Sequence, residues 1–82
     1  MKLPRDVGGR HLADLLSRCG YEITRQTGSH LRLTSTAGDS AHHLTIPVHE
    51  PLKVGTLSAV LADVAGYLGM EKQELIRQLF ER

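Results

Sequence analysis

The chain has 82 residues, a net charge of +1, one cysteine, no tryptophan and 4% aromatic residues. A chain of this length buries only about 60% of the surface that its unfolded form exposes, which predicts a single domain over residues 1–82. The lone cysteine excludes an internal disulfide, and the few aromatic side chains argue against a stacking platform for single-stranded bases. Residues 1–9 lack an apolar stretch long enough for a signal peptide or membrane span, so we expect a cytoplasmic protein without membrane contact.

The first expected element is a helix over residues 8–19. Its apolar side chains recur at i, i+3, i+4 and i+7 and form one stripe, which consists of Leu12, Leu15, Leu16 and Cys19. Gly20 follows this stripe as a candidate C′ residue that ends the helix. On this interpretation Cys19 is a small core residue rather than a reactive thiol.

From Tyr21 onward the apolar residues recur with a period of two, which is typical of β-strands. We expect three strands, at about 21–26, 30–36 and 42–48. Both connections between them contain turn-forming residues and are short enough for hairpins. The three strands should therefore form one antiparallel sheet.

Two helices are expected after the strands. Thr56 is a candidate N-cap for a helix whose apolar stripe consists of Leu57, Val60, Leu61, Val64 and Leu68. A shorter helix at about 71–81 presents Leu75, Ile76, Leu79 and Phe80. The order α-β-β-β-α-α predicts an α+β fold with a three-stranded antiparallel sheet, whose one face is covered by the helices and whose other face is open to solvent.

The alternation of the strands assigns side chains to that open face. If Leu31 and Leu33 point into the core, then His30 and Arg32 point to solvent. The same rule places further side chains on the open face, namely Glu22, Thr24, Thr34, His43, Thr45, Pro47 and His49. His30 is thus expected on a polar surface with an arginine two residues away.

His30 is the candidate catalytic residue. A histidine titrates near neutral pH, so it can remove the proton from a 2′-hydroxyl of RNA, which then attacks the adjacent phosphate. Arg25 and Arg32 are candidates to bind that phosphate by paired hydrogen bonds, and Lys53 could hold the RNA backbone as a point charge.

The residues before His30 have two interpretations. Gly28 and Ser29 permit close approach of a phosphate to the backbone, and Ser29 can donate a hydrogen bond to it. Both are equally ordinary hairpin residues, and a histidine at the start of a strand is often a solvated surface residue. The residues alone leave these alternatives open.

The remaining strand histidines raise the question of a metal site. His42 and His43 are adjacent in one strand, so they point to opposite faces, and no carboxylate or second cysteine completes a ligand set with His49. We therefore expect neither a metal nor a cofactor, and we regard His43 and His49 as accessory residues on the open face.

Three motifs occur in a fixed order along the chain: Gly28-Ser29-His30 opens the second strand, Ile46-Pro47-Val48-His49 closes the third, and Gly55-Thr56-Leu57 starts the following helix. Together with the entry "HLADLLSRCGYEI" into the first strand, they resemble the HicA-type (YcfA-like) toxins, small ribonucleases of HicA/HicB toxin–antitoxin pairs. The similarity covers roughly residues 4–80.

This resemblance implies a fold like that of double-stranded-RNA-binding domains, cleavage of mRNA with His30 as the essential residue, and inhibition by a HicB-type antitoxin that covers the site. His49 matches a recurrent family position, to which we assign a structural or accessory role. The hairpin "TSTAGDSAHH" departs from the family because it lacks the Arg and Lys residues often found there. The helix after Thr56 departs as well, because its pattern runs on through "VAGYLGMEKQ".

We consider three hypotheses for the function. The first is a metal-independent endoribonuclease that cleaves mRNA as the toxin of a toxin–antitoxin pair. The second is a non-catalytic module that binds double-stranded RNA, although the segment "TLSAVLADVAGYLG" carries only one charge, that of the acidic Asp63. The third is an inactive partner that retains only antitoxin binding. We also consider a homodimer.

Overall fold

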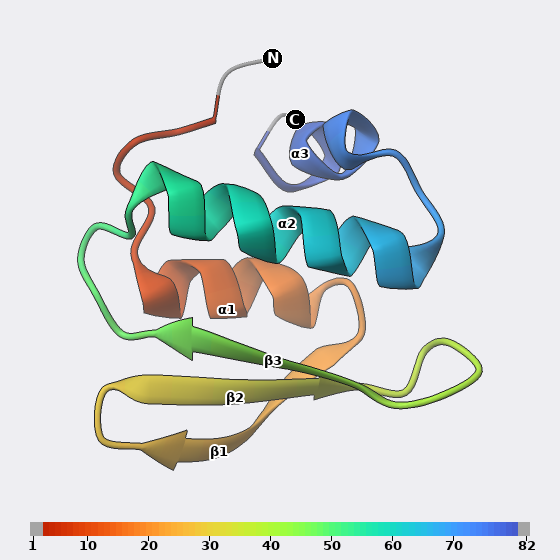
Figure 1. Ribbon diagram of the computed structural model, residues 1–82, viewed down its shortest axis with the longest axis horizontal. Coiled ribbons are helices and arrows are strands. Elements are labelled where there is room, and N and C mark those ends of the chain that lie inside the picture. The colour runs from red at the N-terminus through yellow and green to blue at the C-terminus, as the bar shows by residue number, and fades with distance from the viewer. Residues whose placement is uncertain (1–2, 81–82) are drawn as a thin grey trace.

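The computed structural model describes residues 3–80 and shows three strands and three helices in the order α-β-β-β-α-α (Figure 1). The α+β fold and the predicted order of elements are confirmed. In chain order the elements are α1 (Gly9–Ser17), β1 (Tyr21–Thr27), β2 (His30–Ser35), β3 (His42–Pro47), α2 (Val54–Leu68) and α3 (Lys72–Phe80).

The strands form one antiparallel sheet in the order β1-β2-β3. β1 and β2 are joined by the two-residue loop of Gly28 and Ser29, because Thr27 pairs with His30. Gly28 has a φ of 55°, and no described residue other than glycine has a positive φ. A positive φ at only the first loop residue is what a type II′ turn requires, and this turn matches the right-handed twist of a hairpin.

The helices cover one face of this sheet. α1 packs against all three strands, α2 packs against β3, and α3 packs against α2 (Figure 1). Along β2 the side chains of Leu31, Leu33 and Ser35 are buried, whereas His30 and Arg32 are exposed. The predicted division into a helix-covered face and an open face is therefore confirmed for β2.

The core lies between the sheet and the helices. The stripes predicted for the three helices are buried there, apart from partly buried residues at their margins such as Cys19, Val60, Leu68 and Phe80. The largest fully buried side chains are Tyr21, Leu12, Leu16, Leu31, Leu33, Ile46, Leu57, Leu61, Leu75 and Ile76. Burial of a leucine or isoleucine side chain contributes about 1.5–3 kcal/mol, so this apolar cluster is the main source of stability.

β1 is less well covered than the other strands. Tyr21 is buried at its start, but Ile23, which shares the helix-facing side with Tyr21, is 52% exposed. The sequence pattern groups the two side chains on one apolar face, and only the first of them enters the core. β1 is an edge strand, and the helices do not extend over its outer half (Figure 1).

The observed ends of α1 and α2 differ from the predicted ones. α1 ends at Ser17 instead of residue 19, because the next N–H groups, such as that of Cys19, bond to carbonyls three residues back. The predicted cap at Thr56 is wrong, because Lys53 is the N-cap residue and α2 begins at Val54. The Lys53 side chain makes no capping hydrogen bond, so the start of α2 carries no signal of the kind on which the prediction relied.

A left-handed residue separates α2 from α3. Gly69 has φ 69° and ψ 36°, and the Met70 N–H donates to the Ala65 carbonyl at 3.0 Å. These features form a Schellman-type end, which satisfies carbonyls that the helix itself leaves unpaired. The helical pattern that continues past this point in the sequence is thus divided into two helices.

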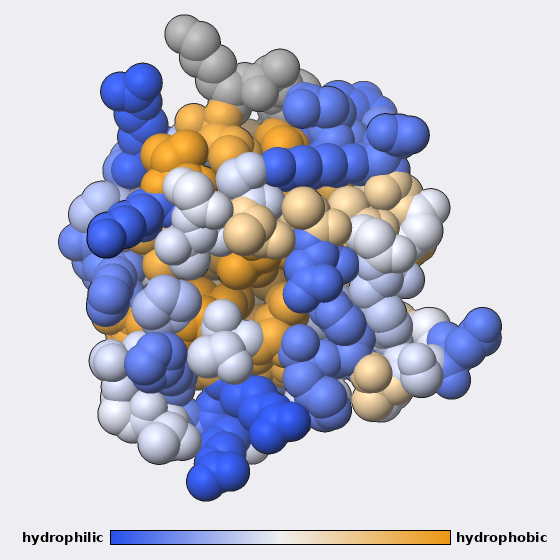
Figure 2. Space-filling model, viewed as in Figure 1, coloured by the Kyte–Doolittle hydropathy of each residue, from blue (hydrophilic) through white to orange (hydrophobic). Residues whose placement is uncertain are grey.

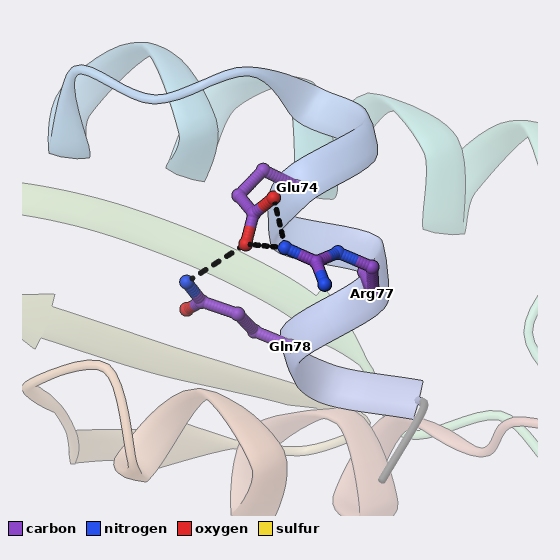
Figure 3. A network of polar contacts seen from close by, with 3 residues as sticks. All are labelled: Glu74, Arg77 and Gln78. Carbon is purple, nitrogen blue, oxygen red and sulfur yellow. Dashed lines mark hydrogen bonds and ion pairs between the residues drawn. The ribbon is translucent and has the colours of Figure 1, made fainter.

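α3 has a polar outer face with a small network of contacts (Figure 3). One guanidinium nitrogen of Arg77 donates to both carboxylate oxygens of Glu74, at 2.5 and 2.6 Å, and Gln78 Nε2 donates to Glu74 at 3.4 Å. The hydrogen bond from Arg77 lowers the pKa of Glu74. Residue 81, the last of the predicted helix, lies outside the described residues.

None of the helices within residues 3–80 has the length and apolar character needed to span a membrane.

Candidate functional site

The open face of the sheet carries three rows of side chains, each of which crosses all three strands. Neighbouring rows are two residues apart along a strand, which corresponds to about 7 Å. The rows consist of Thr27, His30 and Pro47, then Arg25, Arg32 and Thr45, then Glu22, Thr34 and His43. The structure therefore brings His30, Arg32 and Arg25 together on one surface.

An irregularity in β1 places Arg25 on this face. The register shifts between Ile23 and Arg25, so that Thr24 is an extra residue and Arg25 pairs with Arg32. A one-residue bulge reverses the alternation of the strand beyond it. Without the bulge Arg25 would point to the same side as Ile23, toward the helices. The two arginines instead lie directly opposite each other, beside the row of His30.

The His30 ring is exposed, while its backbone is held on both sides. His30 pairs with Thr27 across the hairpin and with Pro47 on β3, and the Val48 N–H donates to the Ser29 carbonyl at 2.7 Å. In the described part of the chain, no side chain forms a hydrogen bond or an ion pair with the His30 ring. The residue is thus fixed in place through its backbone, and its ring is free to contact a bound molecule.

Gly28 and Ser29 form the turn that leads into His30. An ideal Cβ built on Gly28 would meet no heavy atom within 4 Å, so the position requires glycine for its φ of 55° and not for lack of space. Ser29 is exposed. The hairpin role of both residues is confirmed, and the space beside the turn is open. Contact of these residues with a phosphate stays a prediction.

His43 lies on the open face but far from His30. Its Nδ1 is 2.9 Å from Thr34 Oγ1, which is in turn 3.0 Å from Thr24 Oγ1. The row of His43 is four residues along the strand from the row of His30, or about 13 Å. His43 therefore belongs to a different row from His30, and its Nδ1 is already in contact with Thr34.

His49 and Lys53 lie beyond the end of β3. β3 ends at Pro47, so His49 lies outside the strand, where it is exposed, and the alternation of β3 does not fix the direction of its side chain. The His49 carbonyl accepts a hydrogen bond from the Gly9 N–H at 2.9 Å, which joins this segment to the start of α1. Lys53 lines a pocket on the helical side of the molecule. Neither residue belongs to the rows of the open face.

Gly9 closes this junction tightly. An ideal Cβ on Gly9 would lie 2.1 Å from the Pro47 carbonyl oxygen, so any side chain there would overlap the backbone of β3. Pro47 is the cross-strand neighbour of His30. The start of α1 therefore rests directly on the strand end that flanks the candidate catalytic residue.

A second histidine has a full set of partners on the helical side of the sheet. His42 Nδ1 is 2.7 Å from the Tyr21 hydroxyl, and His42 Nε2 is 3.3 Å from Asp63 Oδ1. The His42 ring stacks on Tyr67 with a centroid separation of 4.6 Å and an interplanar angle of 13°. We call these four residues the His42 cluster. The sequence indicates only that His42 and His43 point to opposite faces, which is confirmed.

The His42 cluster also ties down the loop between β2 and β3. The Tyr67 hydroxyl accepts a hydrogen bond from the Gly38 N–H at 2.8 Å and donates to the Ser40 carbonyl at 2.6 Å. Tyr67 lies on α2, so the cluster connects this loop, two strands and a helix. No local sequence signal predicts these contacts, because their members come from four separate segments.

Tyr21 is the most buried member of the cluster, with 1% of its surface exposed. Burial, followed by the nearby Tyr67 and Asp63, raises the pKa of Tyr21 to about 12. A hydroxyl with this pKa stays protonated near neutral pH, and it can donate its proton in a hydrogen bond to His42 Nδ1. The cluster is therefore a satisfied structural network at neutral pH.

The structure also places the remaining candidates for metal or thiol chemistry. Cys19 is half-buried against the core, as predicted, and burial raises the pKa of its thiol. Between residues 3 and 80 there is no group of three or more His, Cys, Asp or Glu side chains that could hold a metal ion.

Comparisons with known proteins add one finding. The family model of the HicA toxin of bacterial toxin–antitoxin systems matches residues 9–65, a segment that runs from the start of α1 to the last turn of α2 and includes the open face with His30. Neither the comparison with curated proteins nor that with solved structures gives a match. Because the family match covers more than half of the chain, the protein belongs to the HicA toxin family of bacterial toxin–antitoxin systems.

Proposed function

We propose that this toxin is an endoribonuclease that cleaves mRNA on the open face of its sheet, with His30 as the general base. The observation that carries the proposal is the position of the His30 ring. It is exposed, has no partner within the described residues, and lies one row from the pair of Arg25 and Arg32. A histidine without a structural partner beside two cations suits a reaction that moves a proton next to a phosphate.

The reaction needs only groups that this face, the RNA and water supply. His30 removes the proton of a 2′-hydroxyl, and the 2′-oxygen attacks the adjacent phosphorus. The bond from phosphorus to the 5′-oxygen of the next nucleotide breaks, and that oxygen takes a proton from water. The products are a 2′,3′-cyclic phosphate on one fragment and a 5′-hydroxyl on the other, so atoms and charges balance.

The arginines contribute through the phosphate. The guanidinium groups of Arg32 and Arg25 bind the non-bridging oxygens, whose negative charge increases as the 2′-oxygen attacks, and paired hydrogen bonds from Arg stabilise that charge. Gly28 and Ser29 allow the backbone to approach the turn, and Lys53 binds the RNA strand farther along. His49 and His43 are accessory residues, because neither lies in the row of His30.

The experiment is cleavage of a long, mostly unpaired RNA by the purified protein in EDTA, in which the parent is compared with His30→Ala. Circular dichroism verifies that both proteins are folded. We expect the parent to cleave and the variant to lose about 10²–10⁴-fold in rate. The ends of the upstream fragments should be 2′,3′-cyclic phosphates or their hydrolysis products.

Other outcomes would reject the proposal. Fragments with a 3′-hydroxyl and a 5′-phosphate would exclude attack by the 2′-oxygen, and equal cleavage by both proteins would exclude His30 as the base. Binding of long duplex RNA that is unchanged in His30→Ala, without cleavage, would instead indicate a binding module. We further propose that a HicB-type antitoxin covers the open face, so that its addition stops cleavage.

A further inference from the structure

A pocket of about 830 Å³ lies on the helical side of the molecule. It is formed by the segment before α1, the start of α2 and the first turns of α3. This volume is in the range of small-molecule sites, which are about 300–1,000 Å³. The reaction proposed for the open face makes no use of most of its lining.

The charged residues of the pocket are all cations. Arg5, Lys53 and Lys72 line it, and no carboxylate does. Neither Arg5 nor Lys53 has an ion-pair partner in the described part of the chain, and Lys72 Nζ donates a hydrogen bond to the Ser58 hydroxyl. Three positive charges around one cavity repel one another, and a bound anion would relieve that repulsion. The electrostatics of the pocket thus favour a phosphate-sized anion.

The rest of the lining is largely apolar. The side chains of Leu52 and Ile76 are buried, and Val54 is 45% exposed. Figure 2 shows apolar surface in orange over the start of α2 and the segment before α1, flanked by hydrophilic side chains in blue. A ligand that fits both parts carries a flat apolar group and a phosphate within one small molecule or one residue of a polymer. A nucleotide has this chemistry.

The pocket lies at the same end of the molecule as His30. β2 begins at this end, and β3 ends there before the chain leads into α2 (Figure 1). His30 is the cross-strand partner of Pro47, and Lys53 follows Pro47 by six positions in the chain. The path from His30 to Lys53 is therefore at most about 27 Å along the backbone, which a few nucleotides of an extended strand can span.

We propose that this pocket binds a nucleoside phosphate, namely a nucleotide of the RNA strand that His30 cleaves. The inference rests on the proposed function and extends it to a second subsite. The base lies on the apolar lining, and Arg5, Lys53 and Lys72 hold the phosphate. Lys53 is the residue at which the path of the strand from the open face reaches the pocket.

Binding of RNA that cannot be cleaved tests this inference independently of catalysis. The probe is a short, fully 2′-O-methylated RNA with a fluorescent label, and its affinity is measured at several salt concentrations. The variants Arg5→Gln and Lys72→Gln each remove one cation of the pocket. Arg18→Gln is the matched control, because Arg18 is an exposed cation at the C-terminal end of α1, away from the pocket.

The two pocket variants should weaken RNA binding by about three- to tenfold each. Each should also lower the slope of log affinity against log salt by about 0.7, which is the slope that one neutralised phosphate of a single strand contributes. Arg18→Gln should change neither quantity. Equal affinity of all three variants and the parent would overturn the inference.

A second measurement distinguishes the sources of the ligand. AMP and inorganic phosphate are titrated into the ¹⁵N-labelled protein, and the amide signals of Ser58 and Gln73 are followed. Tighter binding of AMP than of phosphate would support a nucleoside phosphate, whether free or in a strand. Equal binding of both would overturn it. If the pocket variants bound the antitoxin more weakly but bound RNA like the parent, the pocket would be a contact for a protein. That outcome would also overturn the inference.

The binding test of the pocket and the cleavage test of the proposed function can fail independently of each other. A parent protein that cleaves RNA, with pocket variants that bind the uncleavable probe like the parent, contradicts the pocket alone. A parent that never cleaves, with pocket variants that lose affinity for the probe, contradicts the reaction at His30 and leaves the subsite supported.

Discussion

His30 and His42 lie on opposite faces of the same small sheet and differ in every respect that matters for reactivity. His42 has a tyrosine hydroxyl on one ring nitrogen, a carboxylate near the other and a stacked ring on its face. His30 has none of these within the described residues, although its backbone is paired on both sides. A histidine with all its hydrogen bonds satisfied stabilises a fold. A histidine whose backbone is fixed and whose ring has no hydrogen-bond partner can exchange a proton with a substrate.

The largest effect that separates the two faces should be on catalysis. We expect His30→Ala to reduce cleavage by about 10²–10⁴-fold and to change the free energy of unfolding by less than about 0.5 kcal/mol, as is usual for an exposed side chain.

His42→Ala should affect stability and not cleavage. It should cost about 1–3 kcal/mol of stability, because it leaves the buried Tyr21 hydroxyl without its partner, and it should retain cleavage. Rate assays and urea unfolding of both variants measure this. The predicted difference between the two histidines would be contradicted if folded His42→Ala lost as much cleavage activity as His30→Ala.

Alkaline pH should act on the His42 cluster. The fold raises the pKa of Tyr21 to about 12, so it favours the neutral hydroxyl over the phenolate. This contribution to stability is complete below about pH 10, the pKa of an unfolded tyrosine, and it is lost as the pH rises through 12, in total about 2–3 kcal/mol. Urea unfolding at several pH values measures the loss. Tyr21→Phe should remove it, and Tyr67→Phe should keep the larger part of it, which comes from burial. If Tyr21→Phe showed the same decline, another group would be responsible.

A smaller effect is expected from the arginine pair. Arg25→Gln and Arg32→Gln should each lower kcat/KM by about tenfold, which corresponds to about 1.4 kcal/mol in the transition state. Because the bulge at Thr24 places both arginines on one row, the two variants should behave alike. Steady-state cleavage at one salt concentration makes the comparison, with Arg18→Gln as the control. If Arg25→Gln cleaved at the normal rate and Arg32→Gln did not, the bulge would not place Arg25 in contact with the substrate.

The smallest expected effect concerns the turn before His30. Gly28→Ala forces a side chain into a positive φ and should cost about 1 kcal/mol of stability. Gly66 lies in α2, also with no atom near its ideal Cβ, and Gly66→Ala should stabilise the helix by about 0.5–1 kcal/mol. Thermal unfolding of both variants measures the difference. Equal shifts of the same sign would show that φ at Gly28 does not govern the turn.

Much of the fold can be predicted because its signals are local. The alternation through Leu31 and Leu33 and the helical stripe through Leu57 and Leu61 depend only on spacing, and both sets of side chains are buried as that spacing requires. The boundary at Thr56 could not be predicted in this way. α2 begins without a side-chain cap, so the signal that normally marks a helix start is missing.

The candidate site was predictable only in part, for the same reason. The exposure of His30 follows from alternation within one strand. The orientation of Arg25 depends on a bulge whose register is set by the partner strand, and the partners of His42 come from segments distant in the sequence. The placement of Lys53 beside Arg5 and Lys72 likewise arises from tertiary packing. Strand and helix periods contain no information about such contacts.

Gly9 has no role in the proposed chemistry, yet it limits which sequences can keep the end of β3 in its place. Its Cα rests against the carbonyl of Pro47, so even a methyl group there would push the end of β3 away from α1. Since Pro47 flanks His30 across the strands, that displacement would be transmitted to the ring. Under the role that we propose for His30, a bacterium could therefore silence this toxin by a single alanine mutation on the side of the sheet opposite the histidine, with every polar residue of the site intact.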